Sequence, residues 1–309
     1  MPQPTDASGR TPLVSVAMSF RNNETTLALA IRSILQQTYG NFEVLLCDDG
    51  STDRSLDVAR SFSDSRIVLW SDGKRKYLAT RLNECIDRAS GPYFARMDAD
   101  DVCYPRRIER QLDFMLQHPD IDLIGTYAMV FKGPGEPMGS IKCPATHEEL
   151  TRNPLFGIKL WHNTWLGKTE WFRTNRYNPQ CGLAQDQDLL FRAYRNSRYA
   201  AVPSILVGYR QDQLDLLKMW KYRVLWLQQR SPYLRGVTGQ LRKLALASVL
   251  LAKALIDTFA VLSGLNYRVL RHRAMPVSRA DIRQWEHVWA QCNCLGRMGS
   301  PELPRESVR

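Results

Sequence analysis

The sequence predicts an α/β protein with a mainly parallel sheet flanked by helices, followed by a helical carboxyl-terminal extension. Over the first 130 residues, short apolar runs alternate with segments of helical periodicity, the pattern of successive strand–helix–strand units. Beyond residue 211 this alternation stops, and apolar residues recur only at helical spacing. A chain of 309 residues is long enough for one large domain, or for one domain with an appendage.

The elements follow from the period of the apolar residues. We expect strands at residues 13–18, 42–47, 67–70, 93–97, 121–131 and 201–209. We expect helices at residues 27–35, directly after Asp53, at 78–89, at 105–116 and at 186–196. Ser51 or Thr52 is expected to cap the second helix, and Pro105 suits the first position of the fourth. Residues 132–137, rich in Gly and Pro, predict a loop.

Composition and charge divide the chain into three parts. Residues 1–11 are polar and lack the apolar stretch of a signal peptide, so we expect a flexible tail. Residues 12–210 hold the alternating pattern, and residues 211–309 form a basic helical region. Lys and Arg exceed Asp and Glu by one over residues 1–200 and by ten over residues 201–309. This excess indicates an anionic partner such as a phospholipid, a nucleic acid or an acidic polymer, with a solvated basic surface as the alternative.

The cysteines indicate the cellular compartment. There are seven, an odd number, scattered and mostly in apolar surroundings. This distribution is typical of reduced thiols in the cytoplasm rather than of a disulfide framework.

One apolar segment, Leu244 to Leu265, is long enough to cross a bilayer. It contains Lys253 and Asp257, and each central charge costs roughly 2.5–3.5 kcal/mol, against roughly 0.3–0.6 kcal/mol returned by each large apolar residue. Spanning is therefore marginal. We expect a helix that packs on the protein or lies in the membrane interface, and spanning stays open.

Three carboxylates follow the predicted strand at residues 93–97 and form the strongest functional signal. Asp98, Asp100 and Asp101 lie within four residues. Ligands of open α/β sheets bind at the carboxyl ends of the strands. Carboxylate oxygens suit Mg²⁺ or Mn²⁺, ions that use one or two carboxylates together with phosphate oxygens and water. The sequence therefore predicts a divalent-cation site that carries a diphosphate, with an acidic loop at a helix start as the simpler alternative.

A second acidic pair, Asp48 and Asp49, ends the strand at residues 42–47. A carboxylate at this place can accept hydrogen bonds from the base or ribose of a nucleotide. The alternative is a turn, which Asp, Gly and Ser form routinely. The chain has neither the Gly-x-Gly-x-x-Gly fingerprint nor a P-loop, so neither a dinucleotide site nor a P-loop fold is supported.

Four ordered blocks resemble the family-2 inverting glycosyltransferases, and the resemblance as a whole covers about residues 12–210. The blocks are Val14 to Asn22 with Ala30 to Thr38, Phe42 to Asp53, Asp72-Gly73 with Leu78, Ala79 and Asn83, and Gly91 to Asp101. The resemblance implies a GT-A fold, that is, a Rossmann-like sheet that binds a nucleoside-diphosphate sugar. It is most similar to bacterial enzymes that build envelope polysaccharides and exopolysaccharides.

Carried over by position, the resemblance assigns roles to several residues. Ser19 and Asp49 would contact the base, and Asp98 would face the ribose or the metal. Asp100 would ligate Mn²⁺ or Mg²⁺. The general base would be Asp186, which occupies the place of the Asp in a Glu-Asp pair. The alternative for Asp186 is a favourable charge at a helix start.

The chain departs from the family pattern at three places. Gln185 replaces the usual Glu and cannot ionise, so a role in acceptor binding or in tuning Asp186 is in doubt. Asp212 stands where the family often has a metal-ligating His and is a weak candidate for an oxygen ligand. His162 falls where the family lines its acceptor cleft, and it is a second weak candidate beside Trp165.

The resulting prediction is a metal-dependent hexosyl- or N-acetylhexosaminyl-type transferase on the cytoplasmic face of the membrane. Its expected partners are a nucleoside-diphosphate sugar, with a UDP-sugar the leading candidate, a glycan or lipid-linked acceptor, and an anionic membrane surface. No nucleic acid is expected. Two alternatives remain. A metal-dependent nucleotidyltransferase would also use paired carboxylates, but it normally carries a phosphate loop that this chain lacks. A non-catalytic module could bind a nucleotide or nucleic acid through the basic tail, although the tail aromatics recur at helical spacing.

Overall fold

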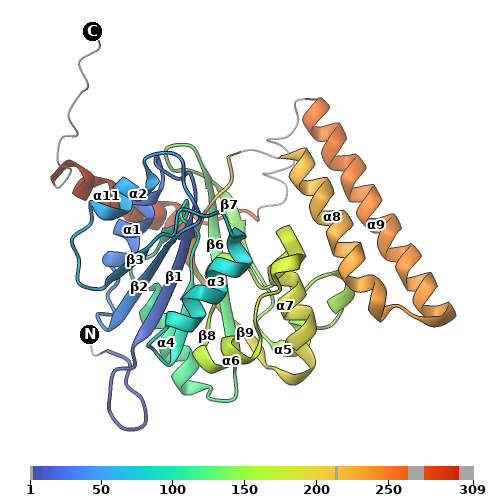
Figure 1. The fold of residues 1–309 in the computed structure, drawn as a ribbon, viewed down its shortest axis with the longest axis horizontal. Helices are drawn as coiled ribbons and strands as arrows, with labels where there is room; N and C mark the ends of the chain where they lie inside the picture. The colour runs from blue at the N-terminus through green and yellow to red at the C-terminus, as the bar shows by residue number, and fades with distance from the viewer. Residues whose placement is uncertain (1–2, 213–214, 264–274, 299–309) are drawn as a thin grey trace.

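The computed structural model describes residues 3–212, 215–263 and 275–298. The described residues form one nine-stranded sheet with helices on both faces (Figure 1). The strands are β1 (Val14–Phe20), β2 (Phe42–Asp48), β3 (Ile67–Trp70), β4 (Tyr93–Arg96), β5 (Val102–Cys103), β6 (Leu123–Lys132), β7 (Glu136–Ile141), β8 (Leu166–Lys168) and β9 (Tyr199–Arg210). The α-helices are α1 (Leu27–Leu35), α2 (Ser55–Arg60), α3 (Tyr77–Arg88), α4 (Arg107–Gln117), α5 (His147–Leu150), α6 (Thr169–Thr174), α7 (Gln185–Ala193), α8 (Leu216–Arg230), α9 (Gly236–Leu262) and α11 (Arg279–Met298).

The sheet is parallel in its first half and mixed in its second. Its strand order is β3-β2-β1-β4-β8-β6-β9-β5, with β7 paired to β6. The strands from β3 to β4 all pair in parallel, as does β6 with β9. The short strands β5, β7 and β8 pair antiparallel with their neighbours. The predicted parallel units thus form the half of the sheet that carries the two acidic motifs.

Side chains alternate between the two faces of the sheet along each strand, and an apolar layer covers each face. Val16 and Met18 of β1 belong to the core on the α1 side, whereas Ala17 belongs to the core that also contains Leu82 of α3. Successive side chains of a strand point to opposite faces, so a strand that is apolar throughout must be covered on both faces. This double cover explains why the strand at residues 13–18 reads as a continuous apolar run rather than as an alternation.

Three local predictions need correction. The second helix begins at Ser55 after Arg54 without a side-chain cap, and the Ser51 hydroxyl instead accepts a hydrogen bond from the Asn22 amide (3.2 Å). The fourth helix begins at Arg107, so Pro105 precedes it. The loop predicted at residues 132–137 is shorter than expected, because β6 ends at Lys132 and β7, which begins at Glu136, pairs back onto it. A β-hairpin needs only a few turn residues, so this Gly- and Pro-rich stretch marks a tight turn between two strands.

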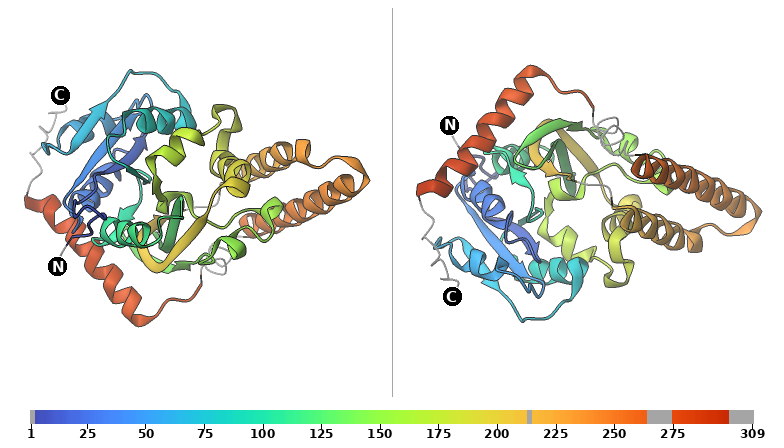
Figure 2. Two further views of the ribbon diagram at one scale, coloured as in Figure 1. Left: turned by 90° about the horizontal axis from the view of Figure 1, so that it is seen from below. Right: turned by 90° about the horizontal axis from the view of Figure 1, so that it is seen from above.

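The carboxyl-terminal third divides into two parts. Helices α8 and α9 form an antiparallel hairpin that projects from the sheet, and α11 returns to lie along it (Figures 1 and 2). Trp285 of α11 is fully buried, and its ring lies 4.7 Å from that of Phe131 in β6. Its Nε1 donates to the Gly135 carbonyl (2.7 Å). The α11 helix is therefore part of the sheet's own core. The hairpin projects from the sheet (Figure 1) and is joined to the rest of the protein through α8, whose Trp226 Nε1 donates to the Leu155 carbonyl (3.1 Å).

Helix α9 contains the predicted apolar segment as far as residue 262, and Ser263 caps it. Residues 264 and 265 lie outside the described residues. It is long and apolar enough to cross a membrane, yet only 22% of its most apolar stretch is buried. Asp257, which is fully buried, forms an ion pair with Arg223 of α8. The structure thus joins α9 to α8 along one side and leaves much of its circumference uncovered.

Candidate active site

The two acidic motifs meet at one edge of the sheet. Asp48 is the last residue of β2, and Asp98 follows β4 by two residues. Both strands pair in parallel with β1, so their carboxyl ends lie side by side. This arrangement brings together the carboxylates that the sequence places 50 residues apart.

Asp49 holds the loop that leads into α3. Its carboxylate accepts hydrogen bonds from the backbone amides of Lys76 (2.6 Å) and Tyr77 (3.0 Å), and from Arg81 Nε (3.1 Å). Tyr77 has a φ of 66°, a conformation unfavourable for a side chain with a Cβ. Asp49 therefore shapes this edge of the cleft. Ser19, half-buried in β1, pairs in register with Cys47 beside it.

Arg81 links the same loop to its helix. Its fully buried guanidinium pairs with Asp49, with Asp72 (2.7 Å) and with Glu84 (2.9 Å). The hydrogen bond from Arg81 is the main reason that the pKa of Asp72 lies far below its usual range. A buried cation is tolerated only when it is paired in this way.

The three carboxylates after β4 form one cluster, with oxygen atoms within 4.8 Å of one another. Asp101 is fully buried, and each of its oxygens accepts a hydrogen bond, one from Asn163 Nδ2 (2.6 Å) and one from the Arg210 amide (2.9 Å). Asp98 is half-buried and forms an ion pair with Arg96, whose Nη1 lies 2.7 Å from Oδ2. Asp101 thus fixes the loop to β9, and Asp98 and Asp100 are the members that line a cavity.

This cluster fits a divalent cation. Burial and the charge of Asp98 raise the pKa of Asp100 to about 6, and burial also raises that of Asp101 well above its usual range. Neighbouring carboxylates disfavour one another's ionised form, and a cation bound between them stabilises that form. The donors are all carboxylate oxygens, which are the ligands that Mg²⁺ and Mn²⁺ prefer. The residues present therefore suit the cation that the sequence predicts.

Asp186 lies near the amino terminus of α7 and lines a cavity of about 1070 Å³ that Asp98 also lines. Burial raises the pKa of Asp186. Asp188, two residues further on, is held by an ion pair with Arg192 (2.8 Å). Gln185 lies in the same cavity wall, is buried, and has an Oε1 with no hydrogen-bond partner among the described residues. The structure thus places Asp186, Gln185 and Asp98 around one space.

The two weak candidates differ in position. His162 lines the same cavity, and its Nε2 lies 2.8 Å from the hydroxyl of Tyr177. Burial and the charge of Arg96 lower the pKa of His162 well below its usual value, so its imidazole is neutral. Asp212 is exposed, and its carboxylate accepts a hydrogen bond from the Gly133 amide (2.7 Å). Within the described residues, the 4.8 Å carboxylate cluster does not include Asp212.

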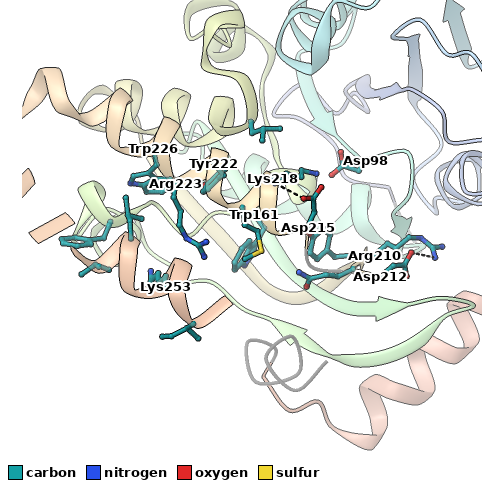
Figure 3. A pocket seen from close by; sticks show the side chains of 18 of the residues that line it. Asp98, Trp161, Arg210, Asp212, Asp215, Lys218, Tyr222, Arg223, Trp226 and Lys253 are labelled. Carbon is teal, nitrogen blue, oxygen red and sulfur yellow. Dashed lines mark hydrogen bonds and ion pairs between the residues drawn. The ribbon is translucent and has the colours of Figure 1, made fainter. Parts of the chain in front are cut away.

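Helix α8 covers one side of the cleft, although the predicted domain boundary at residue 210 puts it outside the catalytic domain. Lys218, Lys221 and Tyr222 line the cavity that holds Asp186. Lys218 and Tyr222 also line a second cavity of about 1110 Å³, which runs from Asp98 and Asp100 to the space between α8 and α9 (Figure 3). Asp98 lines both cavities, so they meet at the acidic cluster.

Sequence reasoning missed two arginines that organise the site. Arg96 and Arg81 are almost completely buried, at 3% and 0% exposure. Arg96 pairs with Asp98, and its charge also lowers the pKa of Asp186, opposing the effect of burial. A signal was present, because Arg96 interrupts an apolar strand and Arg81 lies on the apolar face of its helix. A charged residue at such a position is seldom fully buried unless it is paired.

The family model for glycosyl transferase family 2 matches residues 15–174, about half of the chain. The chain belongs to glycosyl transferase family 2. One relative, the UDP-Glc:alpha-D-GlcNAc-diphosphoundecaprenol beta-1,3-glucosyltransferase WfgD of Escherichia coli, is 37% identical over 118 residues, which are 38% of this chain and 47% of that protein. The chain spans only about half the length of several of the curated relatives it matches.

Solved structures support the GT-A fold. The TarS 1–349 structure of S. aureus in complex with UDP-GlcNAc has a TM-score of 0.59 and 16% identity, covering 90% of this chain and 81% of that one. The mannosyltransferase PcManGT of Pyrobaculum calidifontis, in complex with GDP-Man and Mn²⁺, has a TM-score of 0.55 and 16% identity, covering 97% and 90%. At this level of identity, the likeness shows the fold alone.

Proposed function

We propose that this family-2 member is an inverting glycosyltransferase that moves a sugar from a nucleoside-diphosphate donor to a hydroxyl group. The observation that carries the proposal is the shared cavity of Asp98 and Asp186. One carboxylate belongs to the acidic cluster at the end of β4, and the other lies at a helix start. A donor diphosphate at the first would present its sugar to an acceptor at the second. The family match does not favour a nucleotidyltransferase.

In this proposal Asp186 is the general base. It takes the proton of the acceptor hydroxyl, whose oxygen forms the new bond to the anomeric carbon as the bond to the nucleoside diphosphate breaks. Attack opposite to the leaving group inverts the anomeric configuration. A raised pKa suits this role, because a base is most effective when its pKa approaches the working pH. Gln185 beside it would orient the acceptor by accepting a hydrogen bond at its Oε1, which has no partner among the described residues.

Ser19, Asp49 and Asp98 are proposed to bind the donor. Asp49 and Arg81 hold the 72–77 loop at the proposed nucleobase end of the cleft. Ser19 in β1 lies beside Cys47, which comes two residues before Asp49. Asp100, with Asp98, would hold Mn²⁺ or Mg²⁺, which when bound neutralises negative charge on the diphosphate. Arg96 keeps the Asp98 carboxylate in place through its ion pair. Asp212 stays a weak candidate for a further ligand.

The proposed setting is the cytoplasmic face of a membrane, in the synthesis of an envelope or extracellular polysaccharide. Relatives are named for such work: WfgD acts on a diphosphoundecaprenol acceptor, and WbnJ of Escherichia coli is an O-antigen biosynthesis glycosyltransferase. We propose a UDP-hexose or UDP-N-acetylhexosamine donor and a peripheral attachment. Residues 12–210 would form the transferase domain, joined by α11, which packs on the same core.

A donor screen tests this function. The full chain is incubated with UDP-, GDP- and dTDP-sugars, Mn²⁺ and lipid-linked acceptors, and the released nucleoside diphosphate is measured. We expect one donor class to give acceptor-dependent release that EDTA abolishes. Turnover that persists in EDTA would refute the metal-dependent mechanism, and pyrophosphate release would point instead to nucleotidyl transfer.

A further inference from the structure

The outer side of α9 is apolar and lacks a protein partner among the described residues. Leu244, Leu255 and Leu262 are 64%, 57% and 81% exposed. Further exposed apolar side chains on the helix are Val237, Leu241, Leu251, Ile256 and Phe259. A helix that is apolar almost all round is normally buried in a protein core or in lipid. A contiguous exposed surface of this kind marks an interaction site.

The side of the same helix that adjoins this surface at Ile256 faces the cavity that reaches the acidic cluster. Leu246, Val249, Leu250, Lys253 and Ile256 recur at helical spacing and line this cavity. The opposite wall comes from α8 and includes Met219, Tyr222 and Trp226. The cavity is thus apolar between the helices and acidic at the other end, where Asp98 lies (Figure 3).

The charges of the hairpin are almost all positive. Residues 216–262 contain eight Lys and Arg and one acidic residue, Asp257, which pairs with Arg223. Lys218 and Lys253 line the cavity, and neither side chain makes an ion pair with a described residue. Figure 3 shows Lys253 and Arg223 at the hairpin end of the cavity and Lys218 near Asp98. Two unpaired ammonium groups in a partly apolar groove are suited to a phosphate group.

We propose that the groove between α8 and α9 binds the carrier part of a polyprenyl-diphosphate-linked acceptor. The outer side of α9 is seated in the apolar part of the bilayer leaflet, and the hydrocarbon chain lies against the helix. Lys253 contacts the diphosphate where the groove begins. The glycan extends along the cavity past Lys218 toward Asp98 and Asp186. This inference rests on the proposed function and names its acceptor class.

The chemistry of the groove favours this occupant over a free sugar or an ordinary phospholipid. A free glycan offers neither a hydrocarbon chain for the apolar walls nor an anion for the lysines. An ordinary phospholipid matches both features but has no glycan to occupy the channel between Lys253 and the acidic cluster. Along the cavity an apolar part is followed by a basic part and then by an acidic part. A molecule with a hydrocarbon chain, a diphosphate and a sugar in that order matches this sequence.

Vesicle sedimentation of the full chain tests the site. Phosphatidylcholine vesicles carry undecaprenyl diphosphate or, at matched surface charge, phosphatidylglycerol. We expect the wild type to bind the diphosphate vesicles at least about fivefold more tightly, the contribution of one lysine near an anionic group. Lys253→Glu should remove this preference. The matched control is Arg242→Glu, an equal charge change on the exposed surface of the same helix, which should keep it.

Equal binding of the wild type to both vesicles would overturn the inference, as would equal loss of preference in the two variants. Circular dichroism of each variant verifies that α9 still forms. Donor binding is measured separately on the wild type, as the thermal shift produced by UDP or GDP with Mn²⁺. A shift without lipid preference would refute the groove assignment and leave the proposed function standing. Lipid preference without any shift would support the groove and count against the proposed function.

Discussion

The sheet edge and the α8–α9 hairpin differ in how their charged and apolar side chains find partners. At the sheet edge the buried charges have protein partners, as Arg81 has with three carboxylates and Arg96 with Asp98. In the hairpin one buried ion pair, Arg223 with Asp257, joins two helices whose outer surface is apolar and exposed. The first region is complete within the protein. The second leaves an apolar surface exposed, and we propose that lipid covers it. A cavity lined by both regions connects the two.

The difference shows where function can be separated from stability. Each fully buried Leu or Phe of the sheet core contributes about 1.5–3 kcal/mol to folding, whereas an exposed one on α9 contributes little until it is covered. Substitutions in the sheet region should therefore lower catalysis or stability in solution. Substitutions on the outer side of α9 should show their effect only in the presence of lipid.

The largest effect is expected at the acidic cluster. Asp100→Ala should lower transfer by roughly a thousandfold, because a carboxylate that holds a catalytic metal supports several kcal/mol of transition-state stabilisation. Steady-state release of nucleoside diphosphate with Mn²⁺ is the measurement. Asp120→Ala, at a 62% exposed carboxylate that pairs with Arg198 just before β9, is the control and should keep full activity. An active Asp100→Ala enzyme would refute the metal site.

Next in size is a pair of matched core and hairpin substitutions. Phe94→Ala should lower the free energy of unfolding by about 3–5 kcal/mol, because Phe94 is fully buried and packs 4.9 Å from the ring of Phe172. Phe259→Ala, at a 67% exposed position, should change it by less than about 0.5 kcal/mol. Urea unfolding without lipid gives both values. Comparable losses would mean that α9 is held by protein contacts.

Removal of the base should have a smaller effect than loss of the metal ligand. Asp186→Asn should slow transfer at least about 100-fold, the lower range for a lost general base, while donor and Mn²⁺ still bind. Asp188→Asn is the matched control, since the Asp188 carboxylate is engaged by Arg192, and it should retain most activity. The reverse ranking would show that Asp188 and not Asp186 supplies the base.

The pH dependence should report the same carboxylate. The base acts only when it is deprotonated, and burial raises the pKa of Asp186. As the pH is lowered, the transfer rate should therefore begin to fall at a higher pH than it would with an ordinary aspartate, whose pKa is near 3.9. Below that pKa the rate should fall about tenfold per pH unit. The rate at saturating Mn²⁺ is measured for the wild type and Asp186→Asn. An acid limb that persists unchanged in the variant would belong to another group.

The smallest effect concerns salt and the hairpin. Exposed charges near an anionic leaflet contribute about 1 kcal/mol each and are screened by salt, whereas an inserted apolar helix side is not. Raising the salt concentration should therefore release the protein only partly from phosphatidylglycerol vesicles, and Leu255→Ser should make the release more complete. Truncation near residue 211 is a poor test, because it also removes Trp285 from the sheet core.

Much of the fold could be predicted because its signals are local. The strands β1 to β4 and the helices α1 and α3 agree with the predicted ranges within about two residues, since each is specified by its own apolar pattern. The strand ends locate Asp48 and Asp98, and parallel pairing then brings them to one edge. The short strands β5 and β8 carry no such signal, because two or three residues are too few to show a period.

What the sequence alone determined is thus the parallel half of the sheet, the acidic motifs at its edge, and a long apolar helix in a basic tail. What only the tertiary structure decided is which distant residues meet there. Arg81 binds Asp49 across 32 residues, α8 closes the cleft over Asp186, and α11 packs on β6 while α9 does not. The physical reason is that helical and strand periods are properties of neighbouring residues. Whether a charge is buried, and which helix covers a cleft, depends instead on contacts between distant segments. Only the complete fold brings these segments together.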